Sequence, residues 1–156
     1  MKKIALPIAF VLLLLGLDQL TKYLAVIYLM PIREYVIIEG VFSLLYHENA
    51  GMAFGLFQGG RWFFVVITVI AMAFFVIYYI KLPQSAYHNK QRFFLLLIMG
   101  GALGNFVDRL LHGYVVDFLF IRIINFPIFN VADVFLVVGV FSLVIMMLFV
   151  KEGKNA

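Results

Sequence analysis

Long uncharged apolar runs restrict the fold of this chain more than any other feature. The clearest run is Trp62 to Ile80, nineteen residues in which Thr68 is the only conventionally polar side chain. A helix rises about 1.5 Å per residue and the hydrocarbon core of a bilayer is about 30 Å thick, so a run of this length can span a membrane. Three other runs are similarly apolar and carry few charges. We therefore expect four transmembrane helices, at about 4–27, 62–80, 93–111 and 133–150.

The composition also indicates an integral membrane protein. Hydrophobic residues make up 65% of the 156 residues and charged residues 13%, whereas soluble domains are about 25% charged. At this length we expect one domain, residues 1–156. The absence of cysteine excludes disulfides, thiolate chemistry and zinc–thiolate sites. The net charge is +4, but the basic residues form no polar patch, so we expect no nucleic-acid partner.

The first apolar run has two interpretations. Lys2 and Lys3 followed by a short apolar stretch fit a cleaved secretory signal. However, no small-x-small cleavage site follows, and the apolar run resumes beyond Lys22. In one continuous helix, Asp18 and Lys22 lie at i and i+4 and can form an ion pair, which lowers the cost of carrying both in lipid. We therefore expect a retained first span in which these two residues have a structural role.

The distribution of basic residues predicts the orientation in the membrane. The positive-inside rule places the side with more Lys and Arg near the span ends in the cytoplasm. Both termini should then be cytoplasmic, with residues 28–61 and 112–132 outside. Seven basic residues fall on the first side, Lys2, Lys3, Lys81, Lys90, Arg92, Lys151 and Lys154, and four on the other, Arg33, Arg61, Arg109 and Arg122.

Residues 33–58 differ from the spans. Tyr35–Ile38 and Val41–Tyr46 are rich in β-branched and aromatic residues and are separated by Glu39-Gly40, which favours two strands joined by a turn. Strands inside lipid would leave backbone groups unpaired, so this small sheet should lie on the membrane surface. We expect an all-α membrane protein with four transmembrane helices, a small extracytoplasmic β-sheet, and a short extracytoplasmic loop or helix between spans three and four.

Polar residues gather at the end of the third run and the start of the fourth, within Gly100–Asp133. Ionisable groups at a bilayer edge suggest a functional site. Asp117 and Asp133 can approach each other because the loop between them returns the chain to the membrane. Two adjacent carboxyl groups share one proton, so one can activate water while the other donates a proton. Alternatively, Asp117 is an interfacial loop charge and Asp133 an acid in the first turn of a helix.

The other polar residues also have two interpretations each. Asp108 and Arg109 can form a helix-end ion pair, or Arg109 can bind a lipid phosphate or a substrate carbonyl. Asparagines at 49, 105 and 130 can form turns and caps, or hydrogen-bond an extended peptide. The glycines at 100, 101 and 104 favour close helix packing. Asp108 and His112 are spaced i and i+4, but no HExxH motif or paired-His spacing is present, so we expect no metal.

Five motifs occur in order: DQLTK (18–22), NAGMAFG (49–55), GGALGNFVDR (100–109), VVDF (115–118) and FNVAD (129–133). Together they resemble the motif series of the lipoprotein signal peptidases, also called type II signal peptidases, from the first span to the fourth. Met52 departs from the family, which more usually has alanine there.

The resemblance implies a membrane-embedded aspartyl endopeptidase. Such enzymes remove the signal peptide of a prolipoprotein by cutting just before a cysteine that bears a diacylglyceryl group. Asp117 and Asp133 match the catalytic pair, and Asp18 and Lys22 match a first-span motif that supports the fold. The positions that match substrate-binding, inhibitor-binding or supporting residues are Asn49, Gly51, Asn105, Asp108, Arg109 and Asn130.

The resemblance also implies a setting. It predicts a multi-pass protein of the bacterial inner membrane, in contact with membrane lipid, with its site on the extracytoplasmic side. It predicts inhibition by cyclic peptides of the globomycin type, a monomer, no metal and no organic cofactor. Two other functions compete on the residues alone: an ion or proton transporter using its buried aspartates as a relay, and a non-catalytic scaffold with glycine-faced helices. The chain lacks the paired repeats expected of many transporters.

Overall fold

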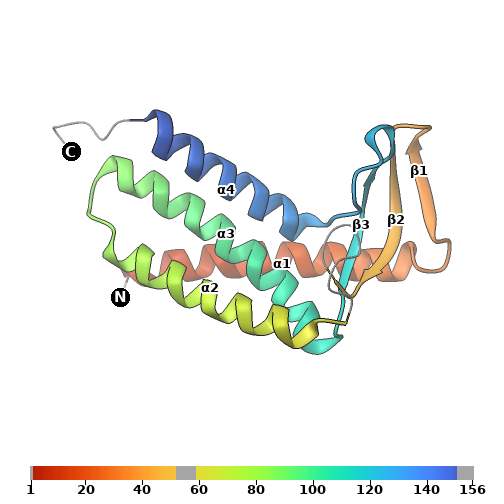
Figure 1. The fold of residues 1–156 in the computed structure, drawn as a ribbon, viewed down its shortest axis with the longest axis horizontal. Coiled ribbons are helices and arrows are strands. Elements are labelled where there is room, and N and C mark those ends of the chain that lie inside the picture. Colours follow the sequence, from red (N-terminus) through yellow and green to blue (C-terminus); the bar gives the residue numbers. More distant parts are fainter. Residues whose placement is uncertain (1, 52–58, 151–156) are drawn as a thin grey trace.

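A computed structural model of the chain describes residues 2–51 and 59–150. Four helices lie side by side and a small sheet stands at one end of them (Figure 1). In chain order, the elements are α1 (Lys2–Tyr28), β1 (Glu34–Ile38), β2 (Phe42–Asn49), α2 (Arg61–Lys81), α3 (Ala86–Leu111), β3 (Val115–Ile121), the short 3-10 helix η2 (Arg122–Ile124) and α4 (Val131–Phe149).

The four long helices confirm the expected spans. Each is long and apolar enough to cross a membrane. The first apolar run forms one helix that continues past Asp18 and Lys22 to Tyr28. α3 begins earlier than the expected start at residue 93, because Ser85 caps it: the Ser85 hydroxyl accepts the His88 N–H at 3.2 Å. Residues 86–92, which lie between the expected second and third spans, therefore form the first turns of α3.

α3 is the central and most buried helix, and it packs against α1, α2 and α4. Its glycines allow the close approach predicted from the sequence. A Cβ atom at Gly104 would lie 2.4 Å from Asp18 Oδ2, and one at Gly101 would lie 2.4 Å from the Ala132 carbonyl oxygen. Both distances are far below van der Waals contact. α1 and α4 can therefore approach α3 this closely only because glycine has no side chain.

The sheet is antiparallel, in the order β1-β2-β3. The expected hairpin is present and turns at Gly40, whose φ is 69°. The part of the predicted sheet at 52–58, including Met52, lies outside the described residues, as do Lys151 and Lys154.

The connection between α3 and α4 contains the expected short helix, η2, and it also supplies the third strand of the sheet, β3, which was not predicted. Residues 115 to 118 are all buried, so the alternation that reveals a half-exposed strand is missing.

A buried apolar cluster fixes the sheet to the bundle. Ala25 of α1 and Leu29, which directly follows that helix, pack with Tyr46 of β2 and with Val116 and Phe118 of β3. Since the last two residues flank position 117, this cluster also fixes the place of Asp117.

Candidate active site

Asn130 brings the carboxyl groups of Asp117 and Asp133 together. Its side-chain Nδ2 donates to Asp117 Oδ1 at 2.7 Å, and its backbone N–H donates to Asp133 Oδ2 at 3.1 Å. Asp117 lies on β3 and is only 2% exposed, while Asp133 lies in the first turn of α4. The two acids that sequence reasoning singled out, sixteen positions apart, therefore bind one shared residue.

Two further asparagines complete the hydrogen bonding of this pair. Asn49 Nδ2 donates to Asp117 Oδ2 at 2.9 Å, and Asn105 Nδ2 donates to Asp133 Oδ1 at 2.7 Å. Each of the four carboxyl oxygens thus accepts a hydrogen bond from an asparagine. The three asparagines come from β2, α3 and the residue that precedes α4, so the site forms where sheet and bundle meet.

Asp133 has the capping position that was considered as an alternative role. The Asn130 side chain accepts the Asp133 N–H at 3.0 Å while Asp133 accepts the Asn130 N–H, forming a capping box. The other half of that alternative is wrong: Asp117 is not an interfacial loop charge but a buried strand residue. Capping leaves the remaining oxygen of Asp133 directed to Asn105.

The surroundings of Asp117 change its proton affinity. Burial and, to a lesser degree, the nearby charge of Asp133 together raise the pKa of Asp117 to about 7, against the opposing effect of hydrogen bonds from Asn49 and Asn130. A carboxyl group in such a site can hold a proton near neutral pH. A carboxyl group that can hold a proton near neutral pH is one requirement for acid–base chemistry by a pair of acids.

A buried ionic cluster lies beside the pair. Lys22 Nζ is 2.8 Å from Asp18 Oδ2, which confirms the predicted i, i+4 ion pair. The same ammonium is 3.1 Å from Asp108 Oδ2 and 3.0 Å from Asn105 Oδ1. The predicted helix-end pairing of Asp108 with Arg109 is replaced by this pairing with Lys22, because α1 packs directly on α3.

Arg109 and Gly51 meet at the outer edge of the site. Arg109 Nη2 donates to the Gly51 carbonyl oxygen at 3.1 Å, and its guanidinium lies 4.6 Å from the ring centroid of Phe64. The Gly51 N–H in turn donates to Asn49 Oδ1 at 3.0 Å. All the residues singled out from the sequence therefore belong to one connected polar region.

Sequence reasoning missed Gln19 and His47. Gln19 Nε2 donates to Asp108 Oδ1 at 2.8 Å and so joins the ionic cluster. The sequence feature that could have indicated Gln19 is its position between Asp18 and Lys22 in an apolar run. It was not selected because its side chain is uncharged. His47 is the register partner of Asp117 in β2, a relation that depends on a strand that was not predicted.

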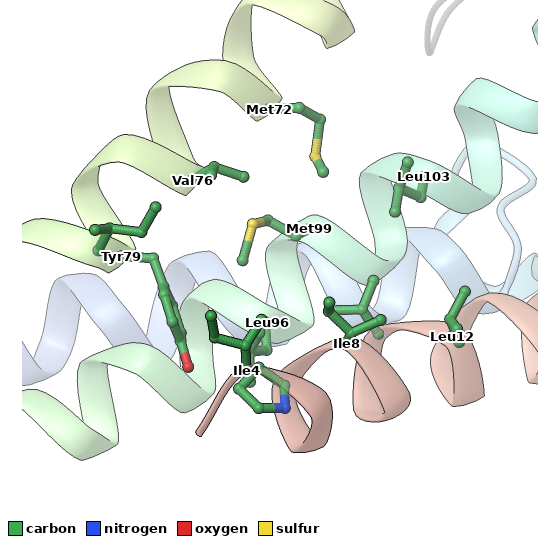
Figure 2. Close-up of a pocket in the computed structure, with 12 residues that line it drawn as sticks. Ile4, Ile8, Leu12, Met72, Val76, Tyr79, Leu96, Met99 and Leu103 are labelled. Carbon is green, nitrogen blue, oxygen red and sulfur yellow. The ribbon is translucent and has the colours of Figure 1, made fainter. Parts of the chain in front are cut away.

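The large apolar groove of the bundle is separate from this polar region. A groove of about 470 Å³ lies between α1, α2 and α3, in the half of the bundle away from the sheet. Figure 2 shows the side chains that line it. The groove carries no acid, base or amide. Its lining residues are Ile4, Pro7, Ile8, Val11, Leu12, Met72, Val76, Tyr79, Ile80, Leu96, Met99 and Leu103.

The described residues, 2–51 and 59–150, contain no group of three or more His, Asp or Glu side chains arranged to hold a metal ion.

The chain resembles proteins of one kind over nearly its whole length. A family model described as signal peptidase (SPase) II matches residues 10–149. A lipoprotein signal peptidase of Caldanaerobacter subterraneus subsp. tengcongensis is 46% identical over 145 residues, which is 92% of this chain and 97% of that protein. A lipoprotein signal peptidase of Clostridioides difficile strain 630 is 43% identical over 150 residues, 96% of this chain and 99% of that protein.

Solved structures agree with the fold. A bacterial membrane enzyme determined by the in meso method at 2.3 Å resolution has a TM-score of 0.82 and 34% identity, covering 98% of this chain and 96% of that one. A second one, at 1.9 Å resolution, has a TM-score of 0.81 and 35% identity, covering 96% of both chains.

Proposed function

The chain belongs to the signal peptidase II family, and from that membership and the geometry of its polar site we infer a lipoprotein signal peptidase that uses Asp117 and Asp133 as its catalytic pair. It is a membrane-embedded aspartyl endopeptidase that removes signal peptides from prolipoproteins, cutting before the diacylglyceryl-modified cysteine. The observation that carries the assignment of the pair is the shared Asn130, which binds both carboxyl groups.

The two aspartates take different roles. Asp117 holds the proton, since burial and the charge of Asp133 raise its pKa to about 7. Asp133 is the carboxylate, since the N-terminus of α4 favours negative charge in its first turn. Asp133 takes a proton from water as the water oxygen bonds to the scissile carbonyl carbon, and Asp117 gives its proton to the carbonyl oxygen.

The second half of the reaction restores the pair. Asp133 passes its proton to the amide nitrogen as the carbon–nitrogen bond breaks, which releases the signal peptide from the new amino terminus of the lipoprotein. Asp117 takes back the proton from the hydroxyl oxygen as the carboxyl product forms. No other reactant is consumed besides the one water molecule.

The location of the site fits a lipid-anchored substrate. Each methylene buried in the bilayer contributes about 0.8 kcal/mol, so the acyl chains hold the modified cysteine at the membrane. An enzyme that cuts beside that cysteine needs its carboxyl groups where the spans end and water can enter. Asp133 in the first turn of α4 and Asp117 in the adjoining strand meet this need.

Several finer features belong to the same proposal. Residues 1–156 act as one peptidase domain and as a monomer, in contact with membrane lipid in the bacterial inner membrane. Both termini are cytoplasmic and the site is extracytoplasmic, as the excess of basic residues at one side supports. Cyclic peptides of the globomycin type bind the region of Asn49, Gly51 and Arg109, where the Asn49 amide donates to Asp117 and the Arg109 guanidinium donates to the Gly51 carbonyl oxygen.

The test is cleavage of a purified diacylglyceryl-modified prolipoprotein by the purified enzyme in detergent. Asp117→Asn and Asp133→Asn should each lower kcat by at least about 10³-fold while the variants stay folded in thermal unfolding. Glu39→Gln, an exposed acid in the β1–β2 turn, is the matched control and keeps full activity. EDTA should leave cleavage unchanged. Normal cleavage by either asparagine variant, or loss of cleavage in EDTA, would contradict the proposal.

A further inference from the structure

Lys22 lies at the centre of a hydrogen-bonded frame inside the bundle. Its side chain is 4% exposed, and its ammonium has three N–H donors. These face three oxygen atoms: Asp18 Oδ2 at 2.8 Å, Asp108 Oδ2 at 3.1 Å and Asn105 Oδ1 at 3.0 Å. Every N–H donor of Lys22 therefore has an acceptor. Each of the three acceptor residues also hydrogen-bonds to a catalytic aspartate or to the residue directly before one.

Two of these links reach the backbone next to the pair. Asp18 Oδ1 accepts the N–H of Ala132 at 2.9 Å, and Ala132 directly precedes Asp133. Asp108 Oδ2 accepts the N–H of Val116 at 3.2 Å, and Val116 directly precedes Asp117. Lys22 thus joins two carboxylates that each accept the backbone N–H of the residue immediately before one catalytic aspartate.

The third link sets the orientation of an amide. Asn105 Oδ1 accepts hydrogen bonds from Lys22 and from Asn130 Nδ2, the latter at 3.1 Å. This leaves Asn105 Nδ2 to donate to Asp133 Oδ1 at 2.7 Å. A flipped amide would place its NH₂ against the ammonium and its oxygen against the carboxylate, so the charge of Lys22 holds the donor toward Asp133.

We propose that Lys22 is a positioning residue for the catalytic pair: it joins Asp18 to Asp108 and orients Asn105, and so sets the distance between Asp117 and Asp133. This inference rests on the proposed function. If Lys22 only balanced charge, an ammonium near Asp18 and Asp108 would be enough. It would not be necessary for these two carboxylates also to accept the N–H groups of Ala132 and Val116. Misplacement of reacting groups by about 1 Å can lower a rate about 100-fold.

The first experiment compares kcat and KM of Lys22→Met with those of the wild-type enzyme, on the same diacylglyceryl-modified prolipoprotein. We expect kcat to fall about 100-fold and KM to stay within about threefold, because Lys22 positions the acids and does not touch substrate. The matched control is Thr21→Val. Its hydroxyl donates to the Asp18 carbonyl oxygen at 2.8 Å, within the same helix, and its loss should leave kcat unchanged.

A charge-balanced variant separates positioning from charge compensation. Lys22→Met alone leaves Asp18 and Asp108 uncompensated in the bundle. The double variant Lys22→Met/Asp18→Asn restores the wild-type net charge of this cluster, and the asparagine oxygen can still accept the Ala132 N–H. We expect its unfolding temperature to recover and its kcat to stay at least about 30-fold low. Recovery of kcat along with stability would overturn the proposal.

If the lysine variants do not fold, Gln19→Leu tests whether this hydrogen-bonded frame positions the catalytic pair. It removes a neutral donor to Asp108 Oδ1 and leaves every charge in place. We expect kcat to fall by roughly 3- to 10-fold at unchanged KM, and full kcat would overturn the proposal. A wild-type enzyme that fails to cleave the precursor would instead contradict the proposed function, so the two failures are distinguishable.

Discussion

At the scale of single residues, the proposed mechanism makes the rate of cleavage depend on the protonation of Asp117. Its pKa of about 7, raised by burial and by Asp133, means that the proton needed by the carbonyl oxygen is present below that pH and lost above it. We therefore expect kcat to decrease as pH rises above about 7, approaching a tenfold decrease per pH unit. The measurement is the rate of prolipoprotein cleavage at saturating substrate between about pH 5 and pH 9.

The control for this profile is His47→Gln. His47 is the register partner of Asp117 in β2, and the other charged groups around the pair are Lys22, Asp108 and Arg109. The alkaline decrease should remain in the glutamine variant, since we assign it to Asp117. If the alkaline decrease is absent in His47→Gln, it must be assigned to the histidine and not to Asp117. A rate that keeps rising to pH 9 would also contradict the role of Asp117.

Asn49 offers a second prediction about the same carboxyl group. Its hydrogen bond to Asp117 Oδ2 lowers the pKa of Asp117, because it stabilises the ionised form. Asn49→Leu should therefore move the alkaline decrease in kcat upward by roughly 0.5–1 pH unit. Asn89→Leu is the matched control: Asn89 accepts a hydrogen bond from Arg92 in α3, and its loss should leave the profile in place. A downward shift for Asn49→Leu would refute the assignment.

At the scale of elements, the contact between α1 and α3 holds the site together. A methyl group at Gly104 would lie 2.4 Å from Asp18 Oδ2 and 3.0 Å from Ala132 Cβ. Gly104→Ala should therefore push the helices apart and lower the free energy of unfolding by about 1–3 kcal/mol, with loss of cleavage. The measurement is denaturant unfolding in mixed micelles.

Gly16→Ala is the matched control for this substitution, because nothing lies within 4 Å of the added methyl group. Alanine is the better helix former, so this variant should gain about 0.5–1 kcal/mol. Equal losses for the two variants would show that helix propensity, and not close packing, explains the effect at Gly104.

The elements also show how far the sequence predicts the fold. Uncharged runs predict the spans because a bilayer imposes their length, and the spacing of Asp18 and Lys22 predicts their ion pair, which is observed. β3 was not predicted because both its faces are buried at residues 115–118, which removes the alternating pattern. Within these limits, local sequence patterns determine the helices and the hairpin.

The site itself was predictable only in part. The sequence motifs identify the two acids and the three asparagines, but not which asparagine donates to which oxygen. The contact of Lys22 with Asp108 joins residues 86 positions apart and exists only once α1 packs on α3. Gln19 and His47 were missed for the same reason, since their partners lie on other elements.

At the scale of the whole molecule, the chemistry requires that the sheet and the catalytic pair face the side of the membrane where lipoproteins are processed. α1 begins and α4 ends at the same end of the bundle, and the sheet stands at the opposite end (Figure 1). Lys81, Lys90 and Arg92 also belong to the end away from the sheet, between α2 and the first turns of α3. The positive-inside rule therefore predicts that the sheet is extracytoplasmic.

The absence of cysteine makes this orientation directly measurable. Glu39 in the β1–β2 turn and Lys90 in the first turns of α3 are both exposed, so each can be replaced singly by cysteine. In cells whose outer layers are permeable but whose inner membrane is sealed, a membrane-impermeant maleimide should label Glu39→Cys and leave Lys90→Cys unlabelled. After the inner membrane is opened by detergent, both should react, which shows that each thiol is accessible. Labelling of Lys90→Cys in sealed cells with protection of Glu39→Cys would place the catalytic pair at the cytoplasmic surface. The proposed cleavage of an exported, lipid-anchored precursor would then have no access to its substrate.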